Sequence, residues 1–156
     1  MIVACNNIGI IQLRMGEHRK AIGSFEELAR HARCIGNDRW LSRAYAGLSD
    51  AWRVLADPGQ ARTLAEQARS IAQRLGPDLE LGVSERALGD ALLAGGRMED
   101  ARDCFARAVP ILERCRDQED LEAARHGYER ACAAIDGKDT RTETSDCSGR
   151  GAFGGS

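Results

Sequence analysis

The sequence predicts an all-α fold made of three helical hairpins followed by a capping helix. The main observation is a repeat: when the 156-residue chain is shifted against itself by 40 positions, six columns hold small or apolar residues in all three copies. Composition points the same way, because aromatic residues make up only 4% and valine and threonine are scarce, which disfavours a β-sandwich. The columns are Ile8/Leu48/Leu88, Gly9/Ser49/Gly89, Gly16/Ala56/Gly96, Ala21/Ala61/Ala101, Phe25/Ala65/Phe105 and Leu28/Ala68/Ala108.

The third copy shows most clearly why each unit should be a pair of helices. Leu88 and Leu92 are one helical turn apart and share a face, while Gly89 beside them lets a second helix approach closely. The glycines at 95–96 can end the first helix, because glycine accepts a left-handed cap at low cost. From Met98 the apolar period of a helix starts again. Its stripe is Ala101, Phe105, Ala108 and Leu112.

Proline and acidic residues mark where helices should begin or break. In the second unit Asp57 is expected to cap a helix that has Pro58 at its first position, where no hydrogen-bond donor is missed. Asp38 and Asp78 are expected to cap the first helices of the second and third units. Pro110 should kink or stop the second helix of the third unit, because proline removes a backbone donor.

The same columns resemble the tetratricopeptide repeat family. The family places Leu-Gly, Gly, Ala, Phe and Ala at fixed offsets in a two-helix unit. The third unit reproduces the pattern and the first echoes it, whereas the middle unit has Ser49, Ala56 and Ala65 in place of two glycines and the phenylalanine. The tryptophan column of the family reads Cys5, Tyr45 and Glu85. The matching residues of the third unit are Leu88, Gly89, Gly96, Ala101, Phe105 and Ala108.

The resemblance implies a right-handed α-solenoid, here with an extended interval of about 40 residues instead of the basic 34. We expect the repeat array to span residues 1–135. The capping helix is expected because terminal units need a polar outer face. The residues that follow are poor in apolar side chains and are expected to be disordered. The expected segments are units at about 2–36, 38–76 and 78–116, a cap at 118–135 and a tail at 136–156.

The resemblance also implies a function, namely binding of a protein or peptide on the concave surface that the first helices line. Helical spacing selects the polar side chains of that surface. Its arginines could bind carboxylates through two parallel hydrogen bonds, and its asparagines could hydrogen-bond an extended peptide. The alternative for each residue is the ordinary polar coat of an exposed helix. The candidate binding residues are Asn6, Asn7, Arg43, Asp50, Arg53, Arg86, Asp90 and Arg130.

Composition and motifs disfavour other classes of function. The net charge of −2 argues against nucleic-acid binding, and no stretch approaches the roughly 20 apolar residues of a membrane span, so a cytoplasmic location is expected. The six cysteines contain no CxxC pair, so we expect reduced thiols, no metal and no cofactor. His18, His31 and His126 do not converge with a nucleophile in the sequence pattern, and we expect no catalytic residues and no enzyme activity.

Two alternatives remain open on the sequence. The chain could be a ligand-sensing regulatory segment of a larger bacterial signalling or transcription-regulatory protein, which an effector domain encoded upstream would support. The first helix begins close to Met1 and has no cap before it. Either the chain belongs to a longer array or another subunit covers this end, so the N-terminal end is also a candidate for self-association.

Overall fold

The computed structural model describes the backbone of residues 1–146 and the side chains of residues 1–137. Within this part of the chain the fold is all-α without a strand, as predicted. Each predicted unit contains two of the helices. The helices are α1 (Ile2–Arg14), α2 (His18–Cys34), α3 (Asp38–Val54), α4 (Pro58–Leu75), α5 (Leu79–Ala94), α6 (Met98–Cys115) and α7 (Gln118–Asp146).

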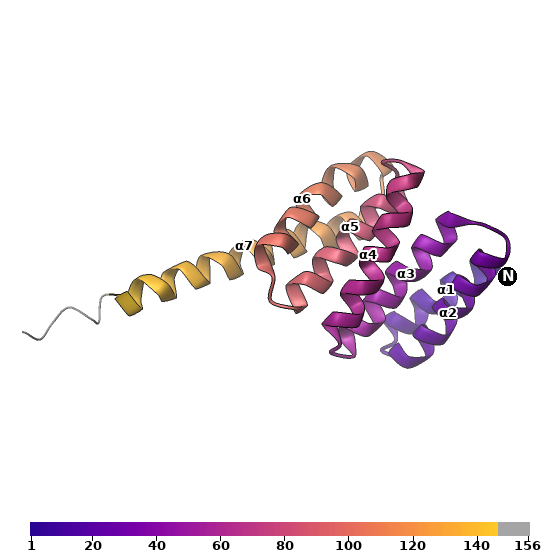
Figure 1. The fold of residues 1–156 in the computed structure, drawn as a ribbon, viewed down its shortest axis with the longest axis horizontal. Coiled ribbons are helices and arrows are strands. Elements are labelled where there is room, and N and C mark those ends of the chain that lie inside the picture. The colour runs from indigo at the N-terminus through magenta and orange to yellow at the C-terminus, as the bar shows by residue number, and fades with distance from the viewer. Residues whose placement is uncertain (147–156) are drawn as a thin grey trace, which may run out of the picture.

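The helices stack side by side from the N-terminal end to α7 (Figure 1). Each first helix contacts the next first helix, α1 with α3, α3 with α5 and α5 with α7. Among the described residues, the second helices α2, α4 and α6 do not contact one another. The first helices are therefore the more closely spaced row, and the array curves toward them. The handedness of the stack stays a prediction.

The core is built mainly from alanine and leucine, with one phenylalanine at each end of the array. Phe105 of α6 is fully buried against Gly89 of α5 and Gly127 of α7. A Cβ atom added at Gly89 would lie 2.7 Å from Cε1 of this ring. Glycine is therefore required at this position for the helices to approach, and we call the arrangement a glycine clamp.

The first half of the array has the same glycine clamp around Phe25 of α2, which lies against Gly9 of α1 and Gly47 of α3. A Cβ atom at Gly9 would lie 2.7 Å from Cζ of this ring, and one at Gly47 would lie 2.5 Å from its Cε1. The two clamps are 80 residues apart, two repeat intervals, so the repeated columns correspond to one repeated contact.

The helix ends agree in part with the predicted caps. Asp57 accepts a hydrogen bond from the backbone N–H of Gln60 at 2.9 Å, and Pro58 begins α4, as predicted. The prediction for Asp38 is wrong, because Asn37 is the cap and accepts from the N–H of Trp40. Asp78 occupies the cap position of α5 but makes no cap hydrogen bond; its Oδ2 pairs with Arg39 at 2.8 Å.

Two helix ends differ from the prediction, and of the predicted kink or stop at Pro110 the stop does not occur. Helix α6 continues through Pro110 to Cys115. Pro110 lies on the exposed side of α6, where water can satisfy the carbonyl group that loses its partner. The predicted end of the cap at residue 135 is also too early, because α7 continues through Asp146 and projects beyond the stack (Figure 1). Helical hydrogen bonds are local, so the extension needs no packing partner. Residues 147–156 of the predicted tail lie outside the described residues.

No helix in the described part of the chain is both long and apolar enough to cross a bilayer.

We predict opposite effects for two glycine-to-alanine changes. Gly89→Ala should lower the free energy of unfolding by about 1–3 kcal/mol, because its methyl group overlaps the buried Phe105 ring. Gly23→Ala is the control: Gly23 lies within α2 and nothing approaches its Cβ position within 4 Å, so alanine should stabilise the helix by about 0.5–1 kcal/mol. Urea unfolding followed by circular dichroism measures both. Equal effects would place the helix contact elsewhere.

Candidate functional site: the inner groove

Two adjoining hollows of about 200 Å³ and 380 Å³ lie along the row of first helices. They share Arg14, Asp50 and Arg86, and we call them together the inner groove. Apart from His18 of α2 and Asp117 before α7, its lining comes from α1, α3, α5 and α7. The spacing of side chains along the first helices therefore gives the groove its wall.

Seven of the eight predicted binding residues line the inner groove; the exception is Asn7. The side chain of Asn7 is exposed and only accepts a long hydrogen bond, at 3.5 Å, from the amide of Asn6. The smaller hollow contains Asn6 and Arg43, and the larger contains Arg53, Asp90 and Arg130. The two remaining predicted residues, Asp50 and Arg86, line both.

Arg86 is the most enclosed charge of the groove and is fully occupied by carboxylates. Its guanidinium group donates to both carboxylate oxygens of Asp50, at 2.8 and 2.9 Å. It also donates to Asp120 at 2.9 Å and to Asp90 at 3.1 Å. Only about 10% of its side chain is exposed. Arg86 therefore ties α3, α5 and α7 together, and it has little left to offer a ligand.

The pKa shifts of this cluster follow from its burial. Burial alone lowers the pKa of the Arg86 guanidinium, but the carboxylates of Asp50, Asp120 and Asp90 raise it well above its usual value. For Asp90 and Asp120, burial raises the pKa of the carboxyl group, and the positive charge of Arg86 only partly opposes this. Three carboxylates around one arginine therefore leave the cluster negatively charged when all are ionised.

Arg43 is partly engaged as well. It donates to the buried carboxylate of Glu80 at 3.2 Å, and Arg39 binds the other oxygen of that group at 2.9 Å. Its guanidinium group also lies 5.5 Å from the centre of the Trp40 ring, within the range of a cation–π interaction. About 30% of the Arg43 side chain is still exposed, so Arg43 can contribute to a contact in the groove but is not free.

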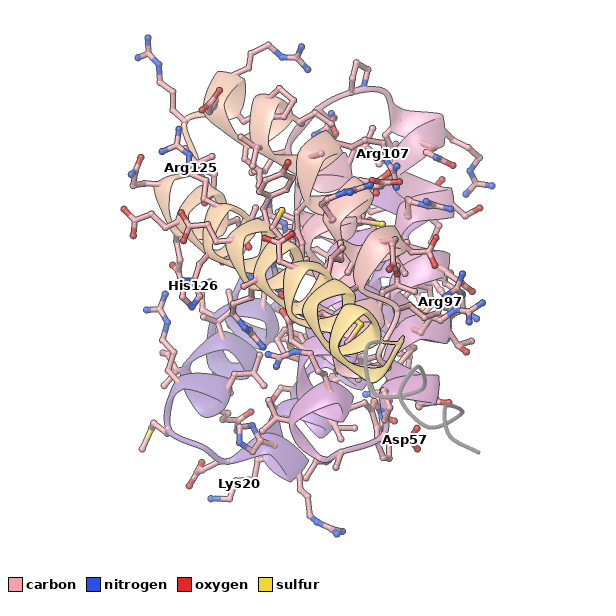
Figure 2. The ribbon with its side chains drawn as sticks, turned by 90° about the vertical axis from the view of Figure 1, so that its left-hand side faces the viewer. Lys20, Asp57, Arg97, Arg107, Arg125 and His126 are labelled. Atoms are coloured by element: carbon pink, nitrogen blue, oxygen red, sulfur yellow. The ribbon has the colours of Figure 1, made fainter. Side chains whose placement is uncertain are left out.

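Arg53 and Arg130 are different, because neither makes an ion pair or side-chain hydrogen bond with any residue that the structure describes. Both line the larger hollow. The Nε atom of Arg53 is buried and without a hydrogen-bond partner, and so is the Nδ1 atom of His18 in the same hollow. His126 completes this end of the groove, on the opposite side of α7 from Arg97 and Arg107 (Figure 2). A buried donor without a partner is costly, so this end of the groove is suited to an anionic group.

One contact spans the mouth of the groove from its first helix to its last. Arg14 at the end of α1 binds Glu119 at the start of α7, with an N–O distance of 2.5 Å. Both side chains are largely exposed, and such a pair contributes only about 0–1 kcal/mol. The bridge can therefore open at little cost when a partner enters.

Sequence spacing missed the cluster around Arg86. Helical spacing shows only that Arg86 and Asp90 are one turn apart. In the structure Arg86 is buried, Asp90 is half-buried, and Asp50 and Asp120 join them from neighbouring helices. One available signal was that Asp50 and Asp90 occupy the same column of the repeat. Two carboxylates that recur at one position on adjacent first helices have to lie close together and need a cation between them.

Cys104, on the far side of the array, does not offer a reactive thiol. Burial is the largest of the effects that raise its pKa, to about 11, and Glu85 adds to it. The thiol is therefore protonated at neutral pH, which makes it a poor nucleophile.

Residues 53–114, which include α4, α5 and most of α6, match the model of the tetratricopeptide repeat family. A comparison with curated proteins found no match.

We predict that Arg86 holds the groove together. Arg86→Met should lower the free energy of unfolding by about 3–5 kcal/mol at neutral pH, because it leaves three carboxylates without their cation. Asp90→Asn is the control and should cost less than about 1 kcal/mol, because the amide oxygen still accepts from Arg86.

The loss in Arg86→Met should shrink on acidification. The folded protein already holds the pKa of Asp90 and Asp120 above the usual value of about 3.9, so it binds more protons than the unfolded chain as pH falls toward that value. Removing the arginine raises these pKa values further, so stability should recover as pH is lowered to about 5. Denaturant unfolding at several pH values measures this. A loss that does not depend on pH would contradict an electrostatic role.

Proposed function

We propose that the chain, whose residues 53–114 match the tetratricopeptide repeat family, is a non-catalytic scaffold that binds a protein or peptide partner in the inner groove. The observation that carries the proposal is a pair of arginines at the end of the groove between α3 and α7, Arg53 and Arg130, which make no ion pair or side-chain hydrogen bond with any described residue. A groove in which every charge was paired could select a partner only by its shape. The guanidinium groups of Arg53 and Arg130 can also donate hydrogen bonds to a partner.

The charges of the groove indicate what a partner should look like. Five arginines and five carboxylates line the two hollows, so the groove as a whole does not favour one sign of charge. Asp117 and Asp120 line the smaller hollow, whereas Arg53 and Arg130 line the larger one together with Asp90. The segment best matched to this distribution is an extended peptide that places a carboxylate near Arg53 and Arg130 and polar or basic groups near Asp117 and Asp120.

The alternative function uses the same groove. As a ligand-sensing segment of a larger signalling protein, the array would transmit a change of curvature through the contacts between first helices. An effector domain encoded in frame upstream would favour this alternative over a free scaffold.

The exposed face of α1 supports a second contact surface. Its apolar residues recur at helical spacing, and the equivalents of Ala4, Ile8 and Ile11 on α3 and α5 are buried where those helices pack on the preceding pair. Ile8 and Ile11 are about half exposed, whereas Leu48 and Leu88 in the same column as Ile8 are 5% exposed or less. The stripe is Met1, Ala4, Ile8, Ile11 and Met15.

We propose that a second copy of the chain covers this stripe. The only charged residue of α1 is Arg14 at its end, so two α1 helices can pack across a two-fold axis with little charge repulsion. The stripe runs at alternating intervals of three and four residues, which is the spacing of helices that pack along their length.

We predict that reversing the two free charges of the groove abolishes partner binding. Arg53→Glu with Arg130→Glu should reduce capture of a partner by the immobilised chain at least about tenfold, because it replaces two donors by carboxylates. The matched control is Arg19→Glu with Arg102→Glu, which changes the net charge equally on second helices, at an exposed and a half-buried position outside the groove. Quantitative affinity capture from a native lysate measures the effect, with circular dichroism to check the fold. Identical capture by all three proteins would remove the larger hollow from the binding site.

We also predict that the chain forms a dimer that depends on α1. Ile8→Glu with Ile11→Glu should shift the protein to a monomer, because it places charges on the contact stripe, whereas Gln73→Glu on the exposed face of α4 should not. Light scattering coupled to size-exclusion chromatography over a range of concentrations measures the mass. A wild-type chain that stays monomeric at the highest concentration would refute the second copy as the occupant.

A further inference from the structure

Three potential metal ligands meet between α1 and α2, and none of them lines the inner groove. They are Cys5 of α1 and Glu27 and His31 of α2, and one ligand atom from each lies within 4.8 Å of the other two. Glu27 and His31 are one helical turn apart and therefore point to the same side of α2.

The structure gives these groups little else to bind. The Nδ1 atom of His31 is buried and has no hydrogen-bond partner. Cys5 is a free, buried thiol with 8% of its surface exposed, and it makes no hydrogen bond within the described residues. Glu27 has only a loose pair with Arg30, at 3.6 Å. A buried polar atom without a partner is destabilising, so the arrangement calls for a ligand.

The third unit shows what normally fills this position. Its equivalents of Cys5 and Glu27, one column each and 80 residues further on, are Glu85 and Arg107. These two form an ion pair at 3.1 Å, in which Glu85 is buried. The third unit thus places an anion opposite a cation. The first unit places a thiol opposite a carboxylate, with an imidazole beside them, and the cation that pairs with this carboxylate, Arg30, is exposed and 3.6 Å away.

We propose that Cys5, Glu27 and His31 bind one zinc-class divalent cation, which takes the place that the guanidinium group of Arg107 has in the third unit. Sulfur, nitrogen and carboxylate oxygen are the ligands that Zn²⁺ prefers, at bond lengths of about 2.0–2.3 Å. Such bonds bring ligand atoms to less than about 4 Å from one another, so the side chains need only a small adjustment from their present spacing. Three protein ligands leave the fourth position for water.

Binding is a simple exchange of a proton for the metal. The Cys5 thiol loses its proton to solvent and its sulfur coordinates as a thiolate, while neutral His31 and the Glu27 carboxylate coordinate without further change. No electron is transferred. The ion would hold α1 against α2 from within, which matters because the outer face of α1 has no neighbour among the described residues.

The sequence contains no standard metal-binding signature for this site because its ligands come from two helices. CxxC spacing places both ligands on one loop, whereas here Cys5 precedes Glu27 by most of a hairpin. The Glu-x-x-x-His spacing on α2 is the one local signal, and it becomes informative only when Cys5 is seen to face it.

Cobalt(II) is the probe that tests this site, because a thiolate ligand gives it an intense near-ultraviolet charge-transfer band that carboxylates and imidazoles do not. The chain, purified without a histidine tag and under reducing conditions, should develop this band with one cobalt ion per chain, and zinc should displace it. Cys5→Ala should abolish the band, and His31→Ala should weaken cobalt binding at least about tenfold, the effect of one lost ligand. Cys34→Ser is the matched control, because Cys34 is an exposed cysteine at the end of α2 that lies outside the cluster.

A second readout is thermal. Zinc should raise the melting temperature of the wild-type chain and of Cys34→Ser, and should raise that of His31→Ala less, because stabilisation by a ligand of the folded state falls as its affinity falls. Two results would overturn the proposal: no charge-transfer band in the wild-type chain, or a band that persists in Cys5→Ala. The second would place the cobalt on another cysteine.

Discussion

The fold depends on one repeated contact, an aromatic ring held between two glycines on adjacent first helices. Phe25 lies between Gly9 and Gly47, and Phe105 lies between Gly89 and Gly127. The middle unit exchanges volume at the same three columns: the ring becomes Ala65, and the two glycines become Ser49 and Ala87, all buried. A large residue with two small neighbours and a small residue with two larger ones fill comparable space, so the interval between helices can stay regular although the residues differ.

This spacing of the first helices is what forms the inner groove. The contact brings α3, α5 and α7 close enough for Arg86 to reach carboxylates on all three, and the resulting ion cluster then holds that part of the groove closed. Because the Asp side chains already bind Arg86, we propose that recognition of a partner depends on other residues of the groove, above all Arg53 and Arg130. The protein thus uses one arginine to shape the groove and leaves others free within it.

Most of the helix positions, and the faces of the first helices that line the groove, could be predicted because they depend on spacing along a single helix. The cluster around Arg86 could not be predicted, because Asp50 and Asp120 lie on other helices, 36 and 34 residues from Arg86 in the sequence. Spacing along one helix does not indicate which opposite charges meet between units. The same limit hid the meeting of Cys5 with Glu27 and His31. The length of α7 was missed for another reason: its last residues have the composition of a tail, and composition does not report local helix formation.

The claim that one aromatic contact sets the spacing of the helices is tested most directly by rebuilding that contact in the middle unit. The free energy of unfolding should be measured for the wild type, for Ala65→Phe, for Ser49→Gly with Ala87→Gly, and for the triple variant that recreates the glycine clamp in the middle unit. If the three columns form one contact, Ala65→Phe alone should be destabilising, and the triple variant should be more stable than the sum of its parts by about 1–3 kcal/mol. Strictly additive energies would show that the columns do not pack together, and the spacing of the groove would then need another cause.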